Sequence, residues 1–289
     1  MSAAGIVRRD DGAALRALRV GVHPDALVQH VGTDVVVRTP SRPDHRAGNV
    51  VDLLTPPDAV AVPDRLEAAR RLLAPIGVDR IHLRYELPTG APDADEPARA
   101  AALGAAGCVA DDLRVLMLPV DALPAADVAS AGAVAVARLP RPDGDVVTDR
   151  RWYAAAVLDR YAHGSDVTDW RAWDAAWGEW DRARVSALAR AGRAEGWTAT
   201  RYGMPVGALT LLDDADGLAV VGSLVVHPAH RRRGIARTLL TTALASLRDV
   251  PRLARVAFPL RPGGPGEALA TSLGFRTVAD VRAWQCPTG

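Results

Sequence analysis

Residues 217–247 constrain the fold most strongly. The stretch 217–228, GLAVVGSLVVHP, is rich in β-branched residues and ends at a proline, which is typical of a strand. A basic run follows at 229–233, and apolar side chains then recur every four residues from Ile235 to Leu247. This spacing indicates a helix with one wide buried face. We therefore expect a strand that leads through a basic loop into a helix over 234–248.

The start of this helix is unusual. No Ser, Thr, Asp or Asn is in place to cap it, so its first N–H groups have no side-chain partner. Arg231, Arg232 and Arg233 crowd the positive end of the helix dipole, which is electrostatically unfavourable. A bound phosphate or pyrophosphate would remove both problems, and Gly234 would permit its close approach. The alternative is a solvated basic turn without a ligand.

The same segment resembles the GNAT acyltransferases. The string from Arg231 to Ala236 matches the Arg/Gln-x-x-Gly-x-Gly/Ala signature of that family, and the preceding strand ends in Val-x-Pro. Further on, Leu273-Gly274-Phe275 resembles the family's late Leu-Gly-Phe turn. The resemblance covers about 133–289. It implies that acetyl-CoA is the co-substrate and that no metal is needed.

The resemblance implies two sets of residues that bind the co-substrate. Backbone N–H groups of the loop and first helical turn would hold the pyrophosphate. The end of the preceding strand would pair with the pantetheine arm, because the family splays this strand from its neighbour. The residues concerned are Leu224, Val225, Val226, Arg231, Arg232, Arg233, Gly234, Ile235, Ala236 and Arg237.

The chain departs from the family at two places. Gly263 stands where an Asn is often found, and Ala270 stands where a Tyr often protonates the leaving thiolate. The catalytic residues are therefore unknown from sequence, with Ser223, Tyr202 and Glu267 as candidate substitutes.

Two histidines also occur in this region. His227 fits the Val-x-Pro turn, and together with His230 it would lack a third metal ligand there.

The N-terminal half resembles a degenerate member of the same family. Residues 35–57 contain the Arg-Thr-Pro…Gly-Asn segment associated with the first half of tandem GNAT proteins. No Arg-x-x-Gly-x-Gly/Ala loop follows, so we expect no second CoA site. Arg38, His45 and Asn49 either face an acceptor or shape the turn that contains them.

Length and pattern together predict the architecture. A chain of 289 residues is most simply two domains. We expect them at 1–125, without a CoA loop, and at 126–289, with the acetyl-CoA site, joined through a small and polar stretch at 120–132. The fold class is α+β with αβα layers: tandem GNAT folds, each a mixed, mostly antiparallel sheet flanked by helices.

Composition excludes several other classes. The net charge is +1 and no run of 18 apolar residues occurs, so we expect no nucleic-acid partner and no membrane association. Two cysteines cannot build a disulfide scaffold or a Cys-rich zinc site, and the first residues do not resemble a secretory signal, so we expect a cytoplasmic protein. All 35 basic residues are Arg, which excludes a Schiff-base lysine and a Walker A lysine.

These features favour an N-acetyltransferase. The acceptor would be a small-molecule amine or a protein N-terminus, and the protein would be a monomer or a homodimer. The alternative is a non-catalytic acyl-CoA-binding or scaffold protein with a decayed site. Four tryptophans at helical spacing would form either an aromatic wall for the acceptor or ordinary packing: Trp170, Trp173, Trp177 and Trp180.

Overall fold

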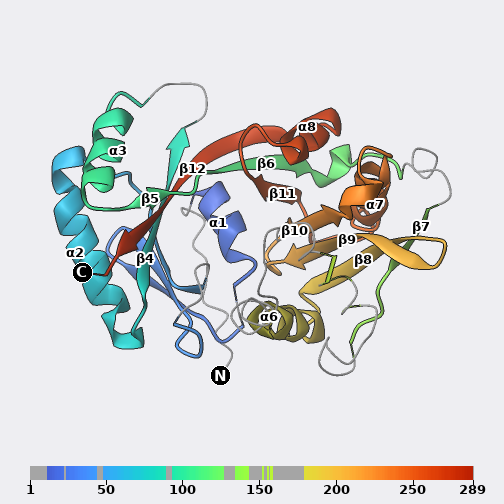
Figure 1. Ribbon diagram of the computed structural model, residues 1–289, viewed down its shortest axis with the longest axis horizontal. Helices are drawn as coiled ribbons and strands as arrows, with labels where there is room; N and C mark the ends of the chain where they lie inside the picture. The colour runs from blue at the N-terminus through green and yellow to red at the C-terminus, as the bar shows by residue number, and fades with distance from the viewer. Residues whose placement is uncertain are drawn as a thin grey trace. The chain divides into compact units, whose positions relative to one another are not determined.

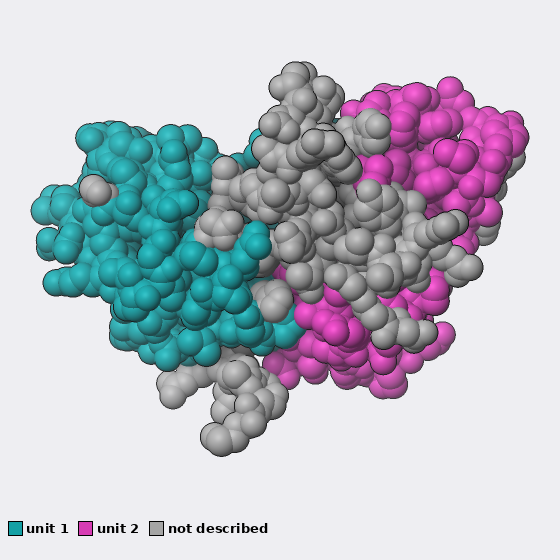
Figure 2. Space-filling model, turned by 60° about the horizontal axis from the view of Figure 1, so that its bottom comes forward, with its two compact units in different colours: residues 1–116, 259–268, 276–289 teal, residues 117–258, 269–275 magenta. Residues whose placement is uncertain are grey.

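The computed structural model forms two compact units, each coloured separately in Figure 2. The residues that it describes are 12–22, 24–43, 48–88, 93–126, 134–142, 152, 155, 157–158 and 179–288. Unit 1 comprises 1–116, 259–268 and 276–289, and unit 2 comprises 117–258 and 269–275. The chain thus passes between the units four times.

Unit 1 contains a mixed sheet in the order β1-β2-β3-β4-β12, with β5 paired to β12 (Figure 1). Every pairing is antiparallel except that of β3 with β4. The strands are β1 (Leu27–Val31), β2 (Asp34–Arg38), β3 (Val50–Leu53), β4 (Arg80–Pro88), β5 (Val109–Ala110) and β12 (Arg276–Pro287). The helices are α1 (Ala13–Arg19), α2 (Val62–Leu73) and α3 (Glu96–Ala105), with 3₁₀ turns at Ala59–Ala61 and Ala74–Ile76.

The sheet of unit 1 lies between helical layers, because side chains alternate along each strand. Val51 and Leu53 of β3 pack in one apolar core with α2 and α3. Asp52, between them, points to the other face and binds Arg19 of α1 at 2.7 Å. This alternation confirms the αβα layering expected for this half.

The last strand of the chain belongs to unit 1. Ladder pairs join β12 to β4 antiparallel from Ala279↔Pro88 to Pro287↔Arg80. A disulfide between Cys108 and Cys286 fixes the end of β12 to the segment before β5. The compact units therefore differ from the division expected at 125/126, because 276–287 completes the first sheet rather than the second.

The strands of unit 2 pair in the order β7-β8-β9-β10-β11 and are referred to as the second sheet. Its strands are β7 (Ala135–Arg138), β8 (Ala194–Arg201), β9 (Met204–Asp213), β10 (Leu218–Val226) and β11 (Arg255–Leu260, the last two residues of which fall in unit 1). Its helices are α6 (Glu179–Arg190) and α7 (Ile235–Ala245), with 3₁₀ turns at Val120–Ala122 and Pro228–His230. The strand β6 (Leu113–Pro119) and the helix α8 (Pro265–Ser272) each begin in unit 1 and end in unit 2.

Opposite faces of the second sheet pack against different segments. The Cβ position of Gly207 on β9 lies 3.2 Å from the side chain of Ile235, at the start of α7. The next residue, Ala208, packs instead with Leu158 and Val225. Three consecutive antiparallel strands, β8, β9 and β10, form a meander.

Candidate functional site

Strand β10 leaves its parallel neighbour before it ends. The ladder with β11 joins only Leu218–Val220 to Arg255–Ala257. On its other edge β10 stays paired with β9 as far as Val226. Within the described strands, the edge of 223–226 that faces away from β9 therefore pairs with no strand, although Arg231 Nε donates to Val226 O. An extended ligand with amide groups can hydrogen-bond to such an edge.

A bulge marks the point of departure. The register between β9 and β10 shifts between Val221 and Ser223, at Gly222. A Cβ atom on Gly222 would lie 2.9 Å from Leu212 Cδ1, so a larger residue would require Leu212 to move. The following residue, Ser223, donates a hydrogen bond from Oγ to Thr210 Oγ1 at 3.3 Å. A hydroxyl pair thus lies at the position where the strands separate.

The loop after β10 turns its backbone sharply. His227 N donates to Val206 O at 2.9 Å, and a 3₁₀ turn over Pro228–His230 follows. Arg232 and Gly234 both have positive φ, of 61° and 75°. Gly234 then precedes α7 as its N-cap, and no side chain caps the helix. Left-handed residues in such a loop and an uncapped helix start leave backbone N–H groups that suit an anion.

The charges around this loop are positive. Arg231, Arg232 and Arg233 are all exposed. Arg231 Nε donates to Val226 O at 3.2 Å, and Arg237 Nη2 donates to Ser272 Oγ at 2.5 Å. These contacts each fix one guanidinium group, the first in the loop and the second in the first turn of α7. The arrangement attracts phosphate, with no acidic residue in the first turn of α7 to oppose it.

The pKa of His230 reflects the positive charge around this loop. Desolvation lowers its pKa, and the nearby charges of His227, Arg233 and Arg201 lower it further. The rings of His227 and His230 meet edge to face, with centroids 5.6 Å apart. His227 Nδ1 accepts from Ala229 N at 3.3 Å, as expected for a residue that shapes the turn.

The structure separates the three candidate catalytic residues. Ser223 lies at the bulge, beside the separated strands. Tyr202 lies at the tip of the β8–β9 hairpin and is 85% exposed. It precedes Thr210, the partner of Ser223, by eight positions, or roughly 26 Å of strand at about 3.3 Å per residue. Tyr202 is therefore poorly placed to act at the bulge.

Glu267 is held as an ion-paired carboxylate. Its Oε1 accepts from Arg114 Nη1 at 2.7 Å, and its Oε2 accepts from Gly263 N at 2.6 Å. These two hydrogen bonds, that of Arg114 foremost, lower the pKa of Glu267. Arg114 also binds Asp280. A carboxylate with both oxygens so engaged is a poor general base or acid, and its contacts suit a structural role.

Ala270, at the family's usual tyrosine position, is fully buried in unit 2. Its carbonyl accepts from Leu273 N and Phe275 N, so it belongs to the turn that ends α8. A tyrosine could not enter this place without repacking.

In the N-terminal half, Asn49 shapes its turn. Its Oδ1 accepts from Thr39 N at 2.7 Å, and its Nδ2 donates to Arg42 O at 2.7 Å. Arg38 binds Gln29 on the neighbouring strand. His45 lies outside the described residues, as do Trp170, Trp173, Trp177 and the side chain of Trp180.

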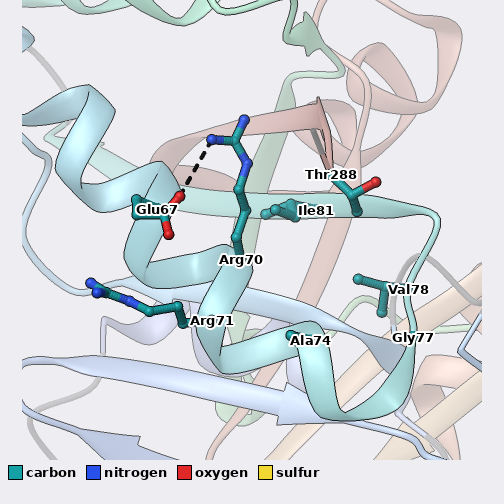
Figure 3. A pocket seen from close by; sticks show the side chains of 8 residues that line it. All are labelled: Glu67, Arg70, Arg71, Ala74, Gly77, Val78, Ile81 and Thr288. Carbon is teal, nitrogen blue, oxygen red and sulfur yellow. Dashed lines mark ion pairs between the residues drawn. The ribbon is translucent and has the colours of Figure 1, made fainter.

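One pocket of about 450 Å³ lies in unit 1 (Figure 3). In it Arg70 pairs with Glu67 at 3.8 Å and donates to Pro287 O, whereas Arg71 points away from both. Its lining residues are Glu67, Arg70, Arg71, Ala74, Gly77, Val78, Ile81 and Thr288. None of the predicted site residues contributes to it, so it is separate from the candidate site in unit 2.

The described residues also bear on a metal site and on a membrane crossing. They contain no cluster of His, Cys, Asp or Glu that could hold a metal ion. Their helices also include none with the length and apolar character that a membrane crossing requires.

The residues of the candidate site lie within a segment that matches a known family. Residues 165–275 match the model of the acetyltransferase (GNAT) family. The chain carries a GNAT domain. The matched residues include the bulge, the basic loop and α7, and they end at Phe275 of the Leu-Gly-Phe turn. No curated protein matches the sequence.

Solved structures resemble nearly the whole chain. A GCN5-related N-acetyltransferase from Kribbella flavida shares 18% identity over 99% of this chain and 97% of its own, with a TM-score of 0.61. A functionally unknown conserved protein from Staphylococcus epidermidis shares 11% over 90% and 92%, with a TM-score of 0.65. A tandem GNAT protein from the clavulanic acid biosynthesis pathway shares 18% over 97% and 93%, with a TM-score of 0.56. At such identities these likenesses support the tandem GNAT fold and nothing finer.

Proposed function

We propose that the protein is an acyl-CoA-dependent N-acyltransferase that moves an acetyl group from acetyl-CoA to an amine. One observation carries the proposal: an unpaired edge of β10 leads directly into an uncapped, arginine-rich helix start. The strand edge suits the amide groups of a pantetheine arm, and the helix start suits a pyrophosphate. CoA contains these two parts in that order.

Each predicted binding residue has a role in this proposal. The backbone of Leu224, Val225 and Val226 would hydrogen-bond to pantetheine. The N–H groups at the start of α7 would hold the pyrophosphate, with the arginine side chains adding charge. The thioester would then lie near the bulge at Gly222, beside Ser223. Acetyl-CoA is therefore proposed as co-substrate, with no metal.

The chemistry itself makes modest demands. A neutral amine attacks the thioester carbonyl, the C–S bond breaks, and the nitrogen loses a proton while the thiolate gains one. Ser223 is the candidate to relay a proton, because its hydroxyl already pairs with Thr210. The acceptor class remains a small-molecule amine or a protein N-terminus.

A second function is favoured by one set of observations. Glu267 is ion-paired, Tyr202 lies at a distant hairpin tip, and Ala270 is buried. A non-catalytic acyl-CoA-binding protein would need none of these groups. Turnover distinguishes the two functions, since both require CoA to bind.

The test has two parts. Calorimetry should show one CoA per chain, because β10 and α7 form a single such arrangement in the described residues. Thiol release from acetyl-CoA is then measured over a panel of amines, with mass spectrometry of the product. Acceptor-dependent release that falls in Ser223→Ala supports the enzyme. Tight binding without release for any amine supports the non-catalytic protein, and no binding overturns both.

A further inference from the structure

The β8–β9 hairpin of unit 2 exposes apolar side chains beside the basic loop. Tyr202 is 85% exposed and Met204 is 67% exposed. Within the described residues of unit 2, these are the only large hydrophobic side chains in the exposed class. Since both occur on one hairpin tip, they form a small apolar surface, which we name the hairpin platform. Exposed apolar groups gathered in one place often mark a binding surface.

The sheet register places the platform next to the loop. His227 N binds Val206 O, so the loop begins beside β9 at a point two residues from Met204. Arg201, which pairs with Met204 across the hairpin, lies close enough to His230 to affect it electrostatically. Arg233 acts on His230 as well. The hairpin tip and the basic loop thus share one positively charged neighbourhood.

The platform has the composition of a stacking surface. Arg201 Cζ lies 5.2 Å from the centroid of the Tyr202 ring, which supports the ring from one side by a cation–π contact. Met204 adds a polarisable thioether, which contacts aromatic rings favourably. Tyr202 and Gly203 both have positive φ, of 52° and 76°, in a turn where Asn-Gly is the usual pair. Stability of the turn alone therefore does not account for a tyrosine there.

We infer that the hairpin platform binds the adenine ring of CoA, by stacking on Tyr202 and contact with Met204. This inference rests on the proposed function, since it places the nucleoside beyond a pyrophosphate held at α7. Stacking fits the site because a purine has a large apolar face, and the surrounding guanidinium groups suit the phosphates attached to it. Residues 201–204 would thereby contribute to co-substrate affinity and discriminate CoA from shorter acyl carriers.

The experiment compares two ligands in matched variants. Affinities for CoA and for 4′-phosphopantetheine, which lacks the adenosine part, are measured by calorimetry. Tyr202→Asn removes the ring and retains a residue that tolerates positive φ. Tyr202→Phe keeps the ring, and Val60→Ala removes a similarly exposed apolar side chain from unit 1, where Val60 is 91% exposed. Thermal unfolding checks that each variant is folded.

We expect Tyr202→Asn to weaken CoA binding about tenfold, in keeping with the usual strength of base stacking. Its affinity for 4′-phosphopantetheine should not change, and Tyr202→Phe and Val60→Ala should bind both ligands as the unaltered protein does. Equal CoA affinity in Tyr202→Asn, or an equal loss for both ligands, would overturn the platform while leaving the proposed function intact. Failure of the unaltered protein to bind CoA would instead overturn the proposed function.

Discussion

Each unit contains a parallel strand pair whose first strand leads into a helix. Of these two pairs, only the pair in unit 2 separates before its first strand ends. In unit 1 the ladder between β3 and β4 continues to Leu53, the last residue of β3. In unit 2 the ladder between β10 and β11 stops at Val220, six residues before β10 ends. A closed ladder leaves no backbone edge for a ligand. The comparison shows that the length of one strand and one bulge distinguish the proposed binding slot of unit 2 from the closed strand pair of unit 1.

The helices that follow these strands, α2 and α7, differ in how the residues of their first turns satisfy the helix start. In α2 a proline occupies the first turn, where a missing N–H costs nothing, and Asp64 places a negative charge at the positive end of the dipole. In α7 the first turn has no acid and no capping side chain. The start of α2 is thus stabilised by its own residues, whereas the start of α7 lacks such residues, as the proposed pyrophosphate site requires.

The largest expected effect concerns the charged interior of unit 1. Asp52 is fully buried and binds both Arg19 and Arg84 at 2.7 Å. Asp52→Ala would remove the buried carboxylate that both guanidinium groups bind, so we expect a loss of about 3–5 kcal/mol in the free energy of unfolding. Denaturant unfolding measures the loss. Asp111→Asn, at the exposed pair with Arg261, is the matched control, with an expected loss below about 1 kcal/mol.

Asp52→Ala also tests the division of roles between the units. Hydrogen exchange should locate the destabilisation in unit 1, while the CoA affinity of the folded fraction stays unchanged. A large loss of CoA affinity without any loss of stability would show that unit 1 takes part in CoA binding.

The second prediction concerns the proposed pyrophosphate site of unit 2. Gly234→Glu places a carboxylate in the proposed pyrophosphate position, so we expect CoA affinity to fall at least a hundredfold, or about 2.8 kcal/mol. Calorimetry measures it. Gly32→Glu makes the same substitution at another left-handed glycine, with φ of 62°, on a hairpin of unit 1. Its CoA affinity should be unaltered. Equal effects in both variants would remove the distinction between the units.

The third prediction uses the disulfide of unit 1. Cys108→Ser/Cys286→Ser removes a bond that closes a loop of 178 residues. We expect the free energy of unfolding to fall by about 2–3 kcal/mol, chiefly because the unfolded chain gains freedom. Chemical denaturation is compared with and without a reducing agent. The reducing agent should shift the midpoint of the unaltered protein and leave that of the double variant unchanged; a shift in both would assign the effect to something other than this bond.

The smallest effect is a pH dependence. Hydrogen bonds from Arg114 and Gly263 lower the pKa of Glu267 below its usual value of 4.5. The folded state therefore favours the ionised form, and this contribution is present above pH 4.5 and is lost as the pH falls through the lowered pKa. We expect less than about 1 kcal/mol, because the pair is partly exposed. Glu267→Gln should remove this part of the stability profile below pH 4.5; an identical profile would show that the ion pair contributes nothing.

Local patterns predicted most of the elements. The strand predicted at 217–228 became β10 and the helix predicted after the basic loop became α7, and β-branched runs also mark β2 and β3. These elements follow from periodicity, which acts over a few residues. The helix α2 begins at Val62, where a proline in the first turn suits a helix start.

What the sequence could not provide depends on distant residues. The pairing of β12 with β4 joins segments about 200 residues apart, and no local signal specifies it. The cysteine pair follows from the pairing of β12 with β5, which places Val109 opposite Gln285. For the site, the loop motif identified Gly234, whereas the bulge at Gly222 was missed. A glycine inside a β-branched strand was the signal that could have found it.

The interleaving of the two units also governs how the chain can acquire its structure during synthesis. The meander β8-β9-β10, α7 and most of β11 are complete once residue 258 has been made. The first sheet must wait for residues 276–287, because its strand β4 has β12 as a neighbour. The half that is translated first is therefore the half that finishes last. Until then β4 presents an open edge, and the growing chain depends on its later residues to cover an early aggregation-prone surface.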